Sequence, residues 1–161
     1  MKLQQALAIG ASVLCIGATA QAGETLDSVK EKGCVQCGVH TGLPGFGIAN
    51  SKGEWEGIDV DVCKEVAAAV FGDSTKYKTT PVTTQQRFTA LQSGEVDVLT
   101  RNTTATMTRD TTLGLMSTGI NYYDSQGIMV KKELGITSAK ELDTATVCVQ
   151  PGTSTELNLA D

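Results

Sequence analysis

Hydrophobic and polar positions follow two different periods in the middle of the chain. Residues 35–39 form a short β-rich run, which predicts a strand. After Gly57 the apolar positions instead recur at helical spacing, at Val62, Val66, Ala69 and Val70. This recurrence predicts an amphipathic helix, in which Asp59 and Asp61 complement the positive end of the helix dipole. Gly72 is expected to end it.

The same alternation continues towards residue 100. Residues 76–82 read as a strand, and a helix is expected from an N-cap at Thr84 to Gly94. Residues 96–99 then read as another strand. The resulting order, β-α-β-α-β, predicts an α/β fold with a mostly parallel sheet covered by helices.

Composition and charge narrow the class of protein. The chain has 161 residues, of which 40% are hydrophobic and 19% charged, as in ordinary soluble globular proteins. Its 13 Lys and Arg residues stand against 18 Asp and Glu, a formal net charge of −5. This acidic balance argues against nucleic acid as a partner, because neutralising phosphates requires a basic face.

Residues 1–22 have the pattern of a secretory signal peptide. Lys2 is followed by no charged residue before Glu24, residues 6–20 are apolar or small, and residues 20–22 read Ala-Gln-Ala, a small-x-small cleavage site. We predict cleavage near Gly23 and export. The alternative is an uncleaved membrane anchor, which the weakly apolar, Ala- and Gly-rich composition disfavours.

Four cysteines remain after this cleavage, and they allow three full pairings: Cys34, Cys37, Cys63 and Cys148. The spacing of Cys34 and Cys37 is that of a thiol redox motif, but residues three apart on a strand point to opposite faces. We therefore expect either buried cysteines or a structural bridge between Cys37 and Cys63. With His40 as the single histidine and no second Cys-x-x-Cys pair, neither a metal site nor a cofactor is expected.

Two loops are candidates for a ligand site, because ligands bind beyond the carboxyl ends of parallel strands. Residues 40–47 contain three glycines and a proline. Residues 100–118 contain eight threonines and the charged residues Arg101, Arg109 and Asp110. An arginine among hydroxyls and amides suits a small carboxylate. A solvated loop with Arg109 paired to Asp110 or Glu95 fits the composition equally well.

Several segments resemble one protein family. Residues 57–70, GIDVDVCKEVAAAV, resemble the signature of the family 3 extracellular solute-binding proteins, which serve ABC transporters for polar amino acids. The general L-amino-acid-binding branch is resembled more narrowly by residues 87–99 (RFTALQSGEVDVL), 101–110 (RNTTATMTRD) and 147–156 (VCVQPGTSTE). The resemblance runs, in order, through nearly all of the chain after residue 22.

The resemblance implies a type II periplasmic-binding-protein-like fold, with two lobes that close on a ligand. Residues 23–130 would form the first lobe. Residues 131–161 would contain a hinge crossing and an incomplete second lobe, beginning with a strand near residue 147 and the start of a helix. The chain would then be a fragment, with weak or absent ligand binding as it stands.

The resemblance also assigns ligand-binding roles. Arg109 would grip the ligand's α-carboxylate, Thr104 would contact the same ligand, and the carbonyl of Asn102 would accept from the α-ammonium group. A turn in the second lobe would give its amides to the carboxylate, from Gly152, Thr153 and Ser154. The loop after the first strand would line the side-chain pocket with His40, Leu43 and Phe46. Many relatives have an aromatic residue at the position of Leu43, so a stacking contact is missing here. Its absence suits a broad ligand range.

The function implied is that of a periplasmic protein that captures L-amino acids for an inner-membrane ABC permease. It would act as a monomer and catalyse no reaction. Two alternatives stay open. One is an enzyme on the same fold, such as a cyclic carboxylic acid dehydratase, which would need His40 as its acid or base near Arg109. The other is a periplasmic ligand sensor that docks on a membrane receptor.

Overall fold

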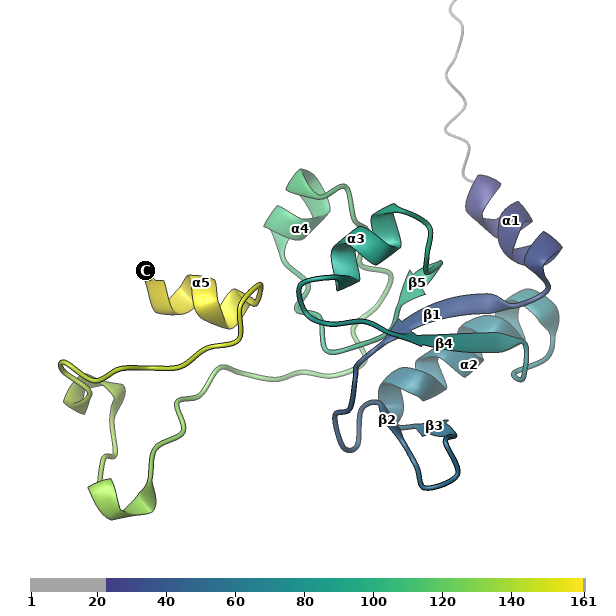
Figure 1. Ribbon diagram of the computed structural model, residues 1–161. Coiled ribbons are helices and arrows are strands. Elements are labelled where there is room, and N and C mark those ends of the chain that lie inside the picture. The colour runs from purple at the N-terminus through teal and green to yellow at the C-terminus, as the bar shows by residue number, and fades with distance from the viewer. Residues whose placement is uncertain (1–22, 161) are drawn as a thin grey trace, which may run out of the picture.

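A parallel three-stranded sheet lies at the centre of the protein (Figure 1). The computed structural model describes residues 23–160, so the predicted signal peptide lies outside the described residues. Strand β1 (Val35–Val39) is central, between β4 (Tyr77–Pro81) and β5 (Val98–Leu99). Val35 pairs with Tyr77, and Cys37 pairs with both Thr79 and Val98. The predicted α/β fold and parallel pairing are confirmed.

Helices cover both faces of this sheet. Helices α1 (Glu24–Lys32) and α2 (Ile58–Phe71) pack on one face, where side chains from α1, β1 and α2 form the larger core cluster: Val29, Val35, Cys37, Val39, Cys63 and Ala67. Helix α3 (Arg87–Gln92) packs on the other face, over a smaller cluster of Val82, Ala90 and Val96. Gly38 faces this second cluster, and a Cβ there would lie 2.9 Å from the Leu99 side chain.

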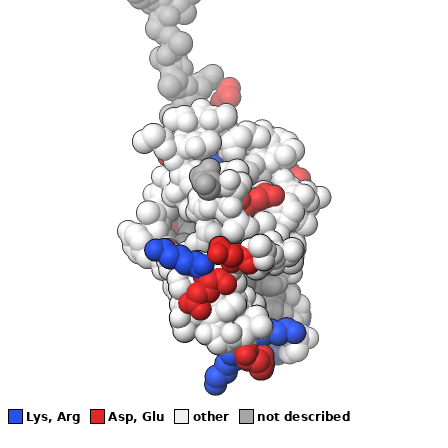
Figure 2. Space-filling model, turned by 90° about the vertical axis from the view of Figure 1, so that its left-hand side faces the viewer, with Lys and Arg blue, Asp and Glu red and all other residues white. Residues whose placement is uncertain are grey.

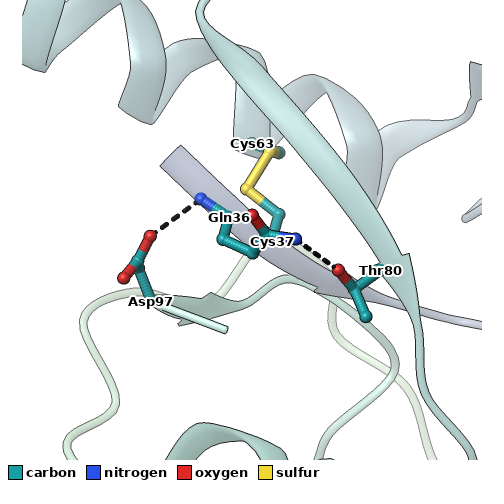
Figure 3. The surroundings of a disulfide bond; sticks show 5 residues. All are labelled: Gln36, Cys37, Cys63, Thr80 and Asp97. Atoms are coloured by element: carbon teal, nitrogen blue, oxygen red, sulfur yellow. Dashed lines mark hydrogen bonds between the residues drawn. A yellow bond between two sulfur atoms is a disulfide. The ribbon is translucent and has the colours of Figure 1, made fainter. Parts of the chain in front are cut away.

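The buried stripe of α2 differs from the predicted one. Val60, Cys63 and Ala67 are fully buried, whereas Ala69 is exposed. The helix is turned so that Cys63 faces Cys37 on strand β1, to which it is joined by a disulfide (Figure 3). Gly72 ends the helix in the left-handed conformation, as predicted.

The disulfide crosses from the central strand to the covering helix. Cys37 and Cys63 are separated by 26 residues, and both are completely buried. Beside them, Gln36 donates from its backbone to Asp97 and from its side chain to Thr80, which ties β1 to both neighbouring segments (Figure 3). Of the two alternatives for the cysteines, the structural bridge is the one observed, with Cys34 and Cys148 as free thiols.

The prediction that Thr84 caps the next helix was wrong. Helix α3 begins at Arg87 with Gln86 as its N-cap, and the hydroxyl of Thr83 accepts from the Gln86 amide at 3.2 Å. Thr84 is buried instead, and its hydroxyl accepts from the Arg101 guanidinium at 3.3 Å. The Thr84 hydroxyl is thus used to satisfy a buried cation, because burying a charge without hydrogen-bond partners is costly.

The rest of the described chain is less regular. A hairpin of β2 (Ile48–Ala49) and β3 (Trp55–Glu56) precedes α2, and α4 (Met107–Thr112) follows β5. Beyond it lie two short 3-10 turns, η1 (Lys132–Leu134) and η2 (Ala139–Glu141), and helix α5 (Ser154–Ala160), on a segment that leaves the sheet (Figure 1). Among residues 23–160, none pairs with residues 147–150, so the strand expected there does not form. The helix expected after it does form.

Two further observations concern the length of the helices and the charge of the surface. No helix in the described part of the chain has the length and apolar content needed to span a bilayer. The face that carries the C-terminal segment is mostly uncharged, with acidic and basic side chains close together in the lower half of the view (Figure 2).

Candidate functional site

The loop after β1 is fixed by the amino end of α2. The Asp59 amide donates to the Phe46 carbonyl at 2.9 Å, and the Ile58 amide donates to the Gly45 carbonyl at 3.1 Å. Gly57, at φ +121°, lies so close that a Cβ there would be 2.3 Å from the Phe46 oxygen. Only glycine fits this position without moving the loop.

Three arginines gather at the carboxyl ends of β4 and β5. Arg101 follows β5, is 5% exposed, and donates to the Val82 carbonyl and the Thr84 hydroxyl. Arg87, on α3, is 2% exposed. Arg109, on α4, donates to the Thr104 carbonyl. The guanidinium carbons of Arg87 and Arg109 lie 4.6 and 5.0 Å from the centre of one ring, that of Phe88.

These three cations lack a matching set of carboxylates. Burial, followed by the charges of Arg109 and Arg101, lowers the pKa of Arg87 to about 10, so it stays charged at neutral pH. Burial also lowers the pKa values of Arg101 and Arg109, and the Asp59 carboxylate offsets this only for Arg101. The ion pairs found among residues 23–160 lie elsewhere, so Arg109 is paired with neither Asp110 nor Glu95. Such a cluster is suited to an anion.

The structure brings most of the predicted ligand-binding residues together around these arginines. The Asn102 and Gly152 carbonyls both accept from Arg87, each at 3.0 Å. The Thr104 and Ser154 hydroxyls lie 2.9 Å apart, within hydrogen-bonding distance. Residues that are 50 or more positions apart in the sequence therefore meet at one place.

The turn before α5 has its own internal carboxylate. The Glu156 side chain accepts from the Gly152 amide at 2.8 Å, and the Glu156 amide donates to the Thr153 hydroxyl at 3.1 Å. This reciprocal pair resembles a capping box and accounts for the start of the helix. The Gly152 amide is therefore already engaged by the chain itself.

The three pocket residues expected on the first loop divide into two groups. Burial and the charges of Arg101 and Arg87 lower the pKa of His40, and its Nδ1 accepts from the Gly42 amide at 2.9 Å. Leu43 instead pairs with Gly47 within the loop, and the Phe46 ring packs edge-on against Tyr122 at 5.0 Å. The described contacts do not bring Leu43 or Phe46 to Arg109.

Asp59 has a different role from the one predicted. It is 1% exposed, and its Oδ1 accepts from the Asn121 side chain at 2.9 Å, while its Oδ2 has no partner among the described residues. Asp61 remains exposed at the helix start and pairs with Lys64 at 2.8 Å. The dipole interpretation therefore fits Asp61, and Asp59 is a buried acceptor that ties residue 121 to α2.

Sequence reasoning named Arg101 only as a charged residue of the candidate loop 100–118, and it gave Arg87 no role in the site. One signal was available, because Arg101 stands two residues after a predicted strand, where ligand groups gather in parallel sheets. Arg87 carried no comparable signal, since a charged residue on a short helix ordinarily faces solvent.

Asp59 leads to a prediction about pH. Burial raises its pKa above the usual value, so the protonated form is favoured in the folded state. Its contribution to stability is complete below the pKa of the unfolded chain and is lost as pH rises through the raised value. Asp59→Asn should therefore gain stability relative to the parent as pH rises above the usual pKa range of an aspartate, measured by urea unfolding at a series of pH values. A constant difference between the two proteins would contradict the raised pKa.

Known proteins are similar to this chain in sequence and in fold. Residues 35–157 match the family model of the bacterial extracellular solute-binding proteins, family 3. The chain belongs to this family. Its fold is periplasmic-binding-protein-like, as the solved structures of relatives confirm.

Among family 3 proteins, the chain is 60% identical over 154 residues to the general L-amino acid-binding periplasmic protein AapJ of Rhizobium johnstonii, covering 96% of this chain and 45% of AapJ. It is 58% identical over 144 residues to the glutamate/glutamine/aspartate/asparagine-binding protein BztA of Rhodobacter capsulatus, covering 89% and 43%. An ABC transporter periplasmic binding protein from Brucella ovis, with glutathione bound, superposes with a TM-score of 0.79 at 62% identity, covering 85% of this chain and 43% of that one. The chain thus spans less than half the length of these relatives.

Proposed function

We propose that this chain belongs to the periplasmic solute-binding component of an amino-acid ABC transporter. It captures L-amino acids of broad side-chain range and delivers them to an inner-membrane permease, as a monomer in the periplasm. The names of its relatives support the class of ligand and the compartment. In this proposal residues 23–130 form the first lobe, and residues 131–161 contain the crossing and the beginning of the second.

One observation carries the proposal: Arg109 is partly buried and has no carboxylate partner among residues 23–160, and it sits beside Thr104. A ligand carboxylate would supply the missing anion and accept two parallel hydrogen bonds from the guanidinium. The Thr104 hydroxyl, which is within hydrogen-bonding distance of the Ser154 hydroxyl, is within reach of the same place. In this proposal Asn102, His40 and the turn at residues 152–154 belong to the same site, and Leu43 and Phe46 line the side-chain pocket.

The same charges predict which amino acids bind poorly. Arg109 and Arg101 bring positive charge to the proposed carboxylate position, and of these two the Asp59 carboxylate acts on Arg101 alone. A cationic side chain would add a like charge to this cluster. Lysine and arginine should therefore bind at least about tenfold more weakly than glutamine, since like charges in a desolvated site cost several kcal/mol.

A ligand panel tests the function. The protein, in the full length that its gene encodes, is titrated with the common L-amino acids while heat and melting temperature are recorded. Saturable binding of several neutral and acidic amino acids, without turnover, is expected. If the whole panel leaves both signals unchanged, the proposal is wrong. The enzyme alternative would need turnover of a carboxylate that is lost in His40→Ala, and the same panel shows whether any turnover occurs.

A further inference from the structure

The hydrogen bonds of Arg87 are not explained by the ligand-binding roles predicted above or by the packing of the sheet. Its Nη1 donates to the Asn102 carbonyl at 3.0 Å and to the Thr103 hydroxyl at 3.3 Å. Its Nη2 donates to the Gly152 carbonyl at 3.0 Å. One guanidinium thus joins the loop after β5 to a turn 65 residues from Arg87 in the sequence.

The turn that Arg87 reaches, residues 150–153, is otherwise lightly attached to the sheet. The chain between residues 116 and 129 is exposed throughout. From α5 itself, Asn158 and Thr155 bond to Gln126, which lies on the same departing segment. Besides the Arg87 bonds, one more hydrogen bond among the described residues joins this C-terminal region to the loop after β5. It lies between the Thr104 and Ser154 hydroxyls.

The junction between the two parts is not filled by side chains. A pocket of about 140 Å³ lies at their junction, lined by Thr83, Thr84, Gln85, Gln150 and Pro151. A Cβ added to Gly152 would still be 3.7 Å from the Thr84 carbonyl. Contact across the junction is therefore made chiefly by directed hydrogen bonds, not by an interlocked apolar core.

Arg87 is also costly to keep in this position. It is 2% exposed, its Nε has no partner among the described residues, and two other arginines lie close enough to lower its pKa. Its hydrogen-bonded acceptors are carbonyl and hydroxyl oxygens, which satisfy its donors without neutralising its charge. A residue that only filled space here would be better apolar, because burying an uncompensated cation is unfavourable.

We propose that Arg87 is a clamp that holds the Gly152 turn over the Arg109 site and so sets how far the site is closed before ligand arrives. The effect of this clamp on ligand affinity rests on the proposed function. A binding protein whose competent form is only partly populated has its apparent affinity reduced by that fraction. Arg87 raises the fraction without touching the ligand, so it acts on every ligand alike and is a positioning residue.

The fork of the guanidinium is essential to this role. Two separate Nη groups reach two separate segments, which a single ammonium group on lysine cannot reproduce in the same geometry. The clamp therefore predicts that Arg87→Lys fails almost as fully as Arg87→Gln. A purely electrostatic role would predict that lysine rescues binding.

The test compares Arg87→Lys, Arg87→Gln and the exposed control Lys52→Gln in the full-length protein. L-Glutamine and L-glutamate are titrated as a neutral and an acidic probe of nearly equal shape. Small-angle scattering gives the radius of gyration with and without saturating L-glutamine. Melting curves establish that each variant is folded, and Arg87→Lys serves if Arg87→Gln is not.

Both Arg87 variants should weaken both probes by the same factor, about tenfold. The ligand-free radius should increase and the saturated radius should match the parent, while Lys52→Gln changes nothing. Loss of L-glutamate affinity alone would overturn the clamp and make Arg87 a ligand contact. Rescue by lysine, or an unchanged ligand-free radius, would also overturn it. If the parent binds neither probe, the proposed function fails, and the ligand-free radii still decide whether Arg87 is a clamp.

Discussion

Arg109→Ala should weaken L-amino-acid binding by roughly 2 to 5 kcal/mol, or about thirtyfold to several thousandfold. The loss is large because the guanidinium is partly desolvated, as its lowered pKa indicates, and has no competing carboxylate among residues 23–160. Removing it leaves the ligand's α-carboxylate without its proposed two-pronged partner. Titration calorimetry on the full-length protein measures the change directly.

Two controls make this result specific. Lys52→Ala removes an exposed positive charge far from the arginine cluster in sequence and should leave affinity unchanged. Arg109→Lys keeps the charge but loses the two-pronged geometry, so it should recover only part of the affinity. A loss of only a few tenths of a kcal/mol for Arg109→Ala would place the carboxylate site elsewhere.

Removing the disulfide should lower the free energy of unfolding by about 3.5 kcal/mol, the loop-entropy value for a bridge closing some 26 residues. The change is the double substitution Cys37→Ala with Cys63→Ala. Because both cysteines lie in the main core cluster, some loss of packing adds to the loop term. Urea unfolding without reductant gives the difference.

Reduction and the remaining cysteines provide the comparison for that experiment. The parent protein in excess reductant should lose most of the same stability, whereas the double variant should not respond. Cys148→Ala, at an exposed free thiol, should change stability by less than about 0.5 kcal/mol. A parent protein indifferent to reductant would show that the bridge does not contribute to folding stability.

Much of the first half of the fold could be predicted because its signals are local. A β-rich run and a left-handed glycine fixed strand β1 and the end of α2, and the β-α-β-α-β order gave the parallel sheet. The rotation of α2 could not be predicted in this way. Val62 and Ala69 match the helical period as well as Val60 and Ala67 do, and the choice depends on Cys37 across the sheet.

Family resemblance pointed to residues that the structure brings together, and sequence reasoning failed where burial decides a residue's contacts. Arg109, Thr104, Asn102 and the Gly152 turn do come together. Asp59 is buried because Asn121, 62 residues later, lies against it. No sequence feature near either residue predicts that contact. The strand expected near residue 147 is absent because a strand needs a neighbour, and none lies beside it among residues 23–160.

The most direct test of the account is a paired titration of the full-length protein with L-alanine and L-alaninamide, which differ at the α-carboxyl group alone. If Arg109 binds that carboxylate beside two further arginines, L-alanine should bind at least about thirtyfold more tightly than the amide, and Arg109→Ala should remove the difference. Equal affinity for the two compounds would contradict the account, because the arginine cluster would then have no part in recognising the ligand.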